Sequence, residues 1–262
     1  MDAAPAAPGQ VLEFAPSGPK YPGIELLLVL GVSLGESAVY SVLSLVNKLT
    51  YEVPLNQQTT TVNPSYTPDR PWLDLAYQIA NIVMPLVPAL LALHLLKVSG
   101  ERARIGFDLK RRGFDIGWGL LCAAGIGLPG LAFLAGAKAL GLNTGIEATN
   151  LGAVWWTIPV LILAAVMNGV LEEVVMIGYF FQRAGNLGWH IALTVIVSAL
   201  VRGSYHLYQG FGSFAGNFIM GVVFGIFYVK AKRVMPLAAA HSAIDIVAFV
   251  GYSLLAPYLT FI

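Results

Sequence analysis

Residues 155–181 read WWTIPVLILAAVMNGVLEEVVMIGYFF, an apolar run that few polar side chains interrupt. A run of about 18 or more such residues is long enough to cross the roughly 30 Å hydrocarbon core of a bilayer as a helix. Two adjacent acidic residues, Glu172 and Glu173, stand deep inside this run. Because charged side chains at membrane depth normally face a bundle interior or a wet cavity, the segment predicts a transmembrane helix with a functional site.

The composition of the whole chain indicates the same environment. Hydrophobic residues make up 57% of the 262 residues and charged residues only 11%, against about 25% charged in soluble domains. We therefore expect an all-α, polytopic transmembrane helical bundle, since helices satisfy every backbone polar group internally. Its spans are predicted at 24–46, 73–96, 118–140, 155–181, 189–206, 211–229 and 234–262. The last run can hide a break at Gly251 or Pro257, so the prediction is seven to eight spans.

The remaining organisation is simple. Residues 1–22 are rich in Ala and Pro and are predicted to be a disordered N-terminal tail without a cleaved signal peptide. Residues 23–262 are predicted to be a single transmembrane domain. The net charge of +1 gives no reason to expect a nucleic-acid partner, whereas membrane lipid is an expected partner. Cys122 is the only cysteine, which excludes a disulfide within the chain.

The distribution of basic residues predicts the orientation. They crowd the connections that follow the second, fourth and sixth spans, namely Lys97, Arg102, Arg104, Lys110, Arg111 and Arg112, then Arg183, then Lys230, Lys232 and Arg233. These three connections share one side if the spans alternate, and the positive-inside rule makes that side the cytoplasm. We expect an integral protein of a bacterial cell membrane with its N-terminus in the cytoplasm and the long loop 47–71 outside.

Polar residues recur four apart in three of the predicted spans, and residues at that spacing share one face of a helix. They are Asn168 and Glu172, with Glu173 adjacent, then Arg202 and His206, then His241 and Asp245. Carboxylates and imidazoles in a dry setting are the groups of general acid-base catalysis, and both are also zinc ligands. They also build proton relays, so a proton- or ion-coupled transporter is a second hypothesis from the same residues.

Three motifs in order resemble those of one protein family. They are Glu172-Glu173 followed by an apolar stretch and Gly178, His206 at the end of the next span, and His241-x-x-x-Asp245 in a later span. In these motifs the chain resembles the CPBP intramembrane proteases, which include the CAAX prenyl endopeptidases and bacterial proteins linked to bacteriocin self-immunity. The resemblance covers residues 155–250, which would be the protease core.

The resemblance implies an intramembrane endopeptidase that hydrolyses a peptide bond of a peptide or protein substrate. By this resemblance, Glu172 and His206 would hold and activate a water, and Glu173 would also be catalytic. His241 and Asp245 would stabilise the oxyanion. Arg202 and Asn168 would support these catalytic residues. A zinc ion would find ligands at Glu172, His206, His241 and Asp245, which would make the protein a metalloprotease. Metal dependence stays open, because the chain has no HExxH helix.

The chain departs from the family pattern at two positions. The Arg that usually follows the second Glu by four residues is replaced by Ile177, and the Phe that usually precedes the His by four is replaced by Arg202. We interpret the two departures as one exchange, in which Arg202 neutralises Glu173 from the next helix. Glu36, alone in the first span, is the alternative partner of Arg202. The missing Arg also supports a third hypothesis, namely that the protein is a catalytically silent membrane scaffold of the same fold.

Overall fold

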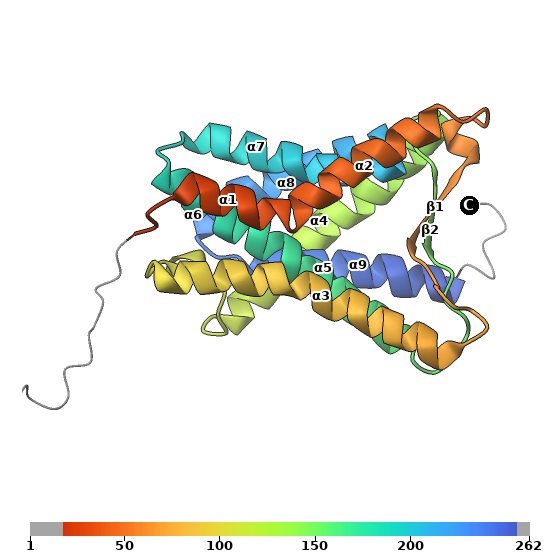
Figure 1. Cartoon of the computed structure of the whole chain (residues 1–262), viewed down its shortest axis with the longest axis horizontal. Coiled ribbons are helices and arrows are strands. Elements are labelled where there is room, and N and C mark those ends of the chain that lie inside the picture. Colours follow the sequence, from red (N-terminus) through yellow and green to blue (C-terminus); the bar gives the residue numbers. More distant parts are fainter. Residues whose placement is uncertain (1–17, 256–262) are drawn as a thin grey trace, which may run out of the picture.

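The computed structural model describes residues 18–255 and shows a bundle of helices (Figure 1). The helices are α1 (Pro22–Gly31), α2 (Leu34–Leu49), α3 (Pro71–Val98), α4 (Arg112–Ala139), α5 (Thr157–Glu172), α6 (Phe180–Asn186), α7 (Ile191–Ser204), α8 (Phe211–Ala231) and α9 (Met235–Leu255). Three short 3₁₀ turns are η1 (Leu55–Gln57), η2 (Arg102–Ile105) and η4 (Leu207–Gln209), and η3 (Glu173–Tyr179) is a π-helix. The predicted all-α bundle is confirmed. Most of the predicted N-terminal tail, residues 1–17, lies outside the described residues.

Helices occupy all seven predicted apolar runs, but not all of them are full spans. Five are long and apolar enough to cross a membrane, namely α3, α4, the continuous helix Thr157–Asn186, α8 and α9, and a sixth span is formed if α1 and α2, bent by 49°, count as one. Helix α7 has 14 residues, about 21 Å at 1.5 Å per residue, and is too short for a full crossing. The described residues thus contain five or six spans where we predicted seven to eight. Helix α9 is unbroken at Gly251, and Pro257 lies outside the described residues.

The turn after α7 lies inside the protein and is covered by a small sheet that the all-α prediction missed. Strands β1 (Thr59–Asn63) and β2 (Gly145–Thr149) pair in parallel. The Lys48 ammonium donates to the Thr60 hydroxyl at 2.6 Å and to the carbonyl of Tyr208 in this turn. The Thr60 hydroxyl in turn hydrogen bonds the Thr144 hydroxyl at 2.7 Å. Segments from two loops therefore fold inward and satisfy polar groups that the short α7 leaves within the bundle.

Small residues bring the functional helices close together. A Cβ at Gly169 of α5 would lie 2.9 Å from the Ala238 carbonyl oxygen of α9, and one at Gly221 of α8 would lie 2.9 Å from Ala199 Cα of α7. Gly221 therefore allows α7 and α8 to pack closely. Backbones that approach this closely are typical of membrane helix pairs. The consequence is that polar side chains of α5, α7 and α9 meet in one place.

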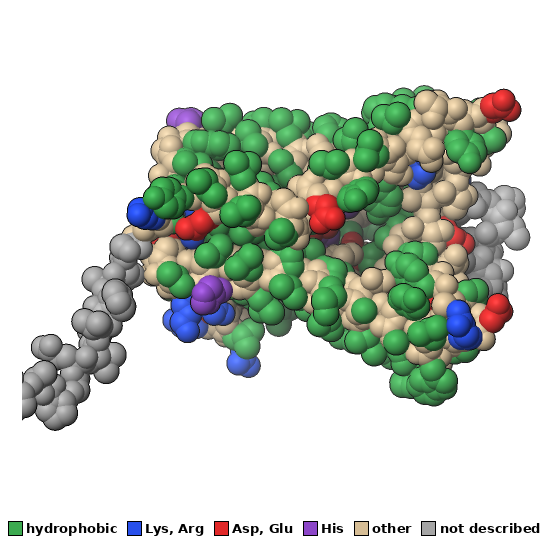
Figure 2. Space-filling model, in the orientation of Figure 1, with side chains coloured by type: hydrophobic (Ala, Val, Ile, Leu, Met, Phe, Trp, Pro, Cys, Tyr) green, Lys and Arg blue, Asp and Glu red, His purple; other side chains and the backbone are tan. Residues whose placement is uncertain are grey.

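Although some basic side chains are visible at the strand end, many of those in Figure 2 lie at the end of the bundle opposite the strands (Figures 1 and 2). Two buried ion-pair groups tie the loops there to the helices. The Arg183 guanidinium lies 2.6 Å from a Glu101 carboxylate oxygen and 2.9 Å from one of Glu25. Arg233 lies 2.7 Å from Asp115 and 3.1 Å from Asp108. The connections after α3, α6 and α8 therefore share one end of the bundle, although α7 is not a full span, and the assignment of that end to the cytoplasm stays a prediction.

Candidate active site

The two adjacent glutamates stand where α5 passes into the π-helix η3. A π-helix carries one extra residue per turn and is frequent at functional sites. Here the wider turn has an outside partner, because the Ser198 hydroxyl of α7 donates to the Met176 carbonyl at 2.8 Å. Glu172 and Glu173 therefore occupy a stretch whose geometry depends on a neighbouring helix. Sequence reasoning predicted a regular helix here and missed the π-helix.

Arg202 neutralises both carboxylates from α7. Its side chain is fully buried, with Nη2 2.8 Å from Glu173 Oε1 and Nη1 3.4 Å from Glu172 Oε2. The guanidinium also lies 5.6 Å from the centre of the Phe224 ring of α8, within range of a cation–π interaction. The predicted pair of Arg202 with Glu173 is present. The alternative partner was wrong, since Glu36 forms no ion pair within residues 18–255.

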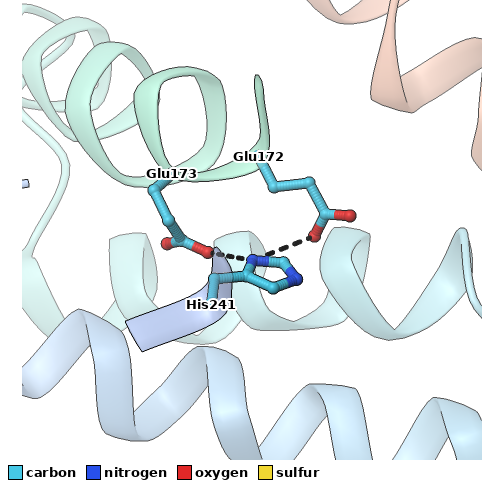
Figure 3. A group of neighbouring side chains, drawn as sticks. All are labelled: Glu172, Glu173 and His241. Atoms are coloured by element: carbon cyan, nitrogen blue, oxygen red, sulfur yellow. Dashed lines mark hydrogen bonds and ion pairs between the residues drawn. The ribbon is translucent and has the colours of Figure 1, made fainter. Parts of the chain in front are cut away.

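His241 of α9 lies between the two carboxylates (Figure 3). Its Nδ1 is 2.8 Å from Glu173 Oε1 and 3.9 Å from Glu172 Oε2. An ionised carboxylate only accepts hydrogen bonds, so Nδ1 is the donor to Glu173. The other ring nitrogen, Nε2, is 3.8 Å from an Asp245 carboxylate oxygen, too far for a hydrogen bond. Asp245 itself accepts a hydrogen bond from the Asn168 amide at 3.0 Å.

His206 follows α7 directly and faces the same carboxylate. Its Nε2 lies 4.0 Å from Glu172 Oε2, and both ring nitrogens are buried without a hydrogen-bond partner in the part of the chain that the structure describes. The side chains of His206 and Glu172 therefore lie at the same level of the bundle.

Sequence reasoning missed Tyr205, whose hydroxyl donates to Glu172 Oε2 at 2.6 Å. Only its position, directly before His206 in an apolar run, hinted at a role, since a buried tyrosine hydroxyl usually needs a partner.

The site residues line one cavity of about 370 Å³. Its polar lining includes all four residues that were expected to act on water or the oxyanion, together with two neighbours, namely Glu172, His206, His241 and Asp245, with Asn168 and Tyr205. Glu173 and Arg202 are not in the lining and lie behind it. The rest of the wall includes the segment directly after β1 and the first half of α3, so the cavity extends toward the end of the bundle that carries the strands.

The segment that holds this site matches a known protein family. Residues 154–247 match the family described as Type II CAAX prenyl endopeptidase Rce1-like. This segment is similar to the CAAX protease family. The matched segment contains all three motifs from which the resemblance was inferred, so the enzyme class is that of a peptide hydrolase. No curated protein and no solved structure matches the chain.

The site also offers ligand atoms for a metal ion. One atom each from Glu172, Glu173 and His241 lie within 4.8 Å of one another. This group differs from the predicted metal set, because Glu173 takes the place of His206 and Asp245. Carboxylate oxygen and imidazole nitrogen suit zinc by type. Glu173 Oε1 already accepts hydrogen bonds from Arg202 and His241, whereas Glu173 Oε2 is buried without a hydrogen-bond partner among the described residues.

Proposed function

We propose that this protein is an intramembrane endopeptidase in which Glu172 activates the attacking water. The supporting observation is the 4.0 Å separation between Glu172 Oε2 and His206 Nε2 at the wall of a shared cavity. This separation is long for a direct hydrogen bond but suits a water that hydrogen bonds both atoms. A base within reach of a held water is the first requirement of general-base hydrolysis.

The surrounding groups support this role of Glu172. Tyr205 and Arg202 donate to Oε2, and they fix the direction of the carboxylate from the side of α7. In the reaction, Glu172 removes a proton from the water as its oxygen attacks the carbonyl carbon of the peptide bond. The carbon–nitrogen bond then breaks, and Glu172 returns the proton to the leaving amine.

His241 is the proposed donor to the oxyanion. The imidazolium form donates from both nitrogens, so Nε2 can donate to the developing negative charge while Nδ1 stays bound to Glu173. Asp245 can donate only in its acid form, and otherwise its role is to hold Asn168 at the cavity wall. Glu173 positions His241, and Arg202 positions Glu172. Neither Glu173 nor Arg202 touches the substrate.

A metal ion would be held by Glu172, His241 and Glu173, with His206 close to the same carboxylate. When bound, it would polarise the scissile carbonyl or the water. The roles of Tyr205 and Arg202 are the same with or without it. Activity of the purified protein before and after treatment with a chelator, with metal analysis of both samples, decides whether a metal takes part.

The test of the function uses purified protein in liposomes with a panel of prenylated and unprenylated peptides, read out by mass spectrometry. Glu172→Gln keeps the shape but removes the base, and we expect cleavage to fall by about 100- to 10,000-fold. Glu52→Gln, an exposed loop residue, is the matched control and should cleave normally. Ion flux that depends on Glu172 while no peptide is cut would support the transporter, and a biological effect unchanged by Glu172→Gln would support the scaffold.

A further inference from the structure

A second hollow, a groove of about 470 Å³, lies beside the active-site cavity. Its walls come from the break between α1 and α2 and from the middle of α3, and they are mostly apolar, as with Met84, Val87 and Leu91. The groove and the cavity share four lining residues, namely Leu34, Ser37, Pro85 and Leu171. Leu171 directly precedes Glu172 in the chain. The groove therefore leads from the lipid-facing side of the bundle to the candidate catalytic carboxylate.

Both helices that form the groove are irregular at this level. Helix α1 ends and α2 begins around Val32 and Ser33, and α3 contains Pro85 and Pro88. A proline lacks the N–H that would bond the carbonyl one turn earlier. Irregular backbone at membrane depth is tolerated where it lines a cavity or is buried in protein. Two facing irregular helices at the same level are therefore a sign of a site rather than of simple packing.

Glu36 lies on the wall of this groove. Its side chain is exposed and has no hydrogen bond or ion pair within residues 18–255. Figure 2 shows an acidic side chain at the edge of a hollow in the middle of an otherwise largely hydrophobic face. The carboxylates Glu172 and Glu173, in contrast, are both paired. Ionisable residues at membrane depth mark substrate or ion pathways by default, and Glu36 has no structural partner that would explain it otherwise.

We propose that the groove binds the membrane-embedded segment of a peptide substrate and that Glu36 pairs with a Lys or Arg side chain of that segment. The inference rests on the proposed protease function, and it adds a charge preference to it. An unpaired carboxylate attracts a cation, and the apolar walls of the groove can pack against the apolar side chains of the segment. The ten residues of α1, about 15 Å of helix, separate the break from the end of the bundle. We expect the lipid headgroups at that end, too far from Glu36 to supply the cation, so the cation would arrive on a chain within the membrane.

Binding can be measured without cleavage in a Glu172→Gln background, in nanodiscs of phosphatidylcholine. The probes are fluorescent apolar peptides of about 20 residues that carry one central Lys or, in the matched peptide, Gln at the same position. We expect the Lys peptide to bind about tenfold more tightly than the Gln peptide. Glu36→Gln should remove this preference, Glu36→Lys should transfer it to a peptide with a central Glu, and Glu52→Gln should leave it unchanged.

Three results would overturn the inference. They are equal binding of the Lys and Gln peptides, a Lys preference that persists in Glu36→Gln, and no binding by any peptide. The proposed protease function fails by a different measurement, namely cleavage that is unaffected by Glu172→Gln. Since Glu36 is exposed, its substitution by Gln should leave the size-exclusion profile unchanged, which separates loss of the preference from misfolding.

Discussion

The Arg202 guanidinium contacts two carboxylates and faces an aromatic ring, and its side chain is fully buried. In such a pair the two charges compensate each other, and removal of one leaves the other unpaired in a low-dielectric interior. The prediction of this pair from the sequence succeeded for the same reason, because an intramembrane Glu173 without the usual Arg required another cation. Tyr205 could not be predicted in this way, since its hydroxyl carries no charge that demands a partner.

Arg202→Ala should destabilise the protein by about 3 to 5 kcal/mol, because Glu173 then stays buried without its cation. Thermal unfolding in detergent is the measurement. The double variant Ile177→Arg with Arg202→Phe places the cation four residues after Glu173 on the same helix and should recover part of the loss. Arg104→Ala is the control, since the Arg104 side chain is largely exposed, lies 3.5 Å from Glu101, and should contribute at most about 1 kcal/mol through this pair. An Arg202→Ala protein as stable as this control would contradict the prediction.

Tyr205→Phe keeps the ring and removes only the hydroxyl that donates to Glu172. A hydrogen bond to a charged group contributes about 1.5 to 3 kcal/mol. We therefore expect the cleavage rate to fall by about 10- to 100-fold and the folded protein to lose stability by no more than about 1.5 to 3 kcal/mol. Tyr228→Phe is the matched control, because Tyr228 is also buried but lies outside the cavity. Equal rates for the two variants would show that Tyr205 does not orient the carboxylate.

At the scale of elements, the bilayer made most of the helices predictable. All seven apolar runs contain helices, because a chain in lipid must satisfy its backbone internally. The π-helix and the strands β1 and β2 could not be predicted, since both depend on contacts between distant residues. The strands have five residues each and lie far apart in the sequence. The predicted length of α7 was also wrong, because the apolar run 189–206 continues past the end of the helix into the turn that the loops cover.

The π-helix depends on α7 through one hydrogen bond, from Ser198 to the Met176 carbonyl. Ser198→Ala should remove this buried hydrogen bond and destabilise the protein by about 0.5 to 1.5 kcal/mol. Cleavage should fall as well, because Glu172 and Glu173 begin the affected turn. Ser204→Ala on the same helix is the control, as its hydroxyl bonds only its own helix at Leu200. A Ser198→Ala protein that matches this control in both measurements would show that the π-helix needs no support from α7.

At the scale of the whole molecule, the loops at the basic end are held by buried ion pairs that respond to pH. Burial would raise the pKa of Glu101, but hydrogen bonds from Ser99, Asn186 and Arg183 outweigh it and hold this pKa below its usual value of 4.5. A carboxyl with a lowered folded-state pKa stabilises the fold above its unfolded pKa and loses that contribution as the pH falls through the folded value. Thermal stability should therefore fall below about pH 4.5. Glu101→Gln should be less stable than the wild type at pH 7, with a difference that shrinks as the pH falls; a constant difference would exclude this role.

The orientation is tested by single cysteines in a Cys122→Ser background. Cysteines at Arg111 and Lys232, which are exposed at the basic end, should react from the cytoplasmic side, and one at Glu52 only from outside. We choose Glu52 because Thr60, in the same loop, is buried. Labelling of Arg111 and Lys232 from opposite sides would contradict both the alternation of spans and the common cavity.

The cavity wall that follows β1 has a consequence for where cleavage products go. The cavity extends toward the strands and away from the basic loops. With the orientation that we predict from the basic residues, a product that left the cavity by this route would reach the side of the membrane that faces away from the cytoplasm.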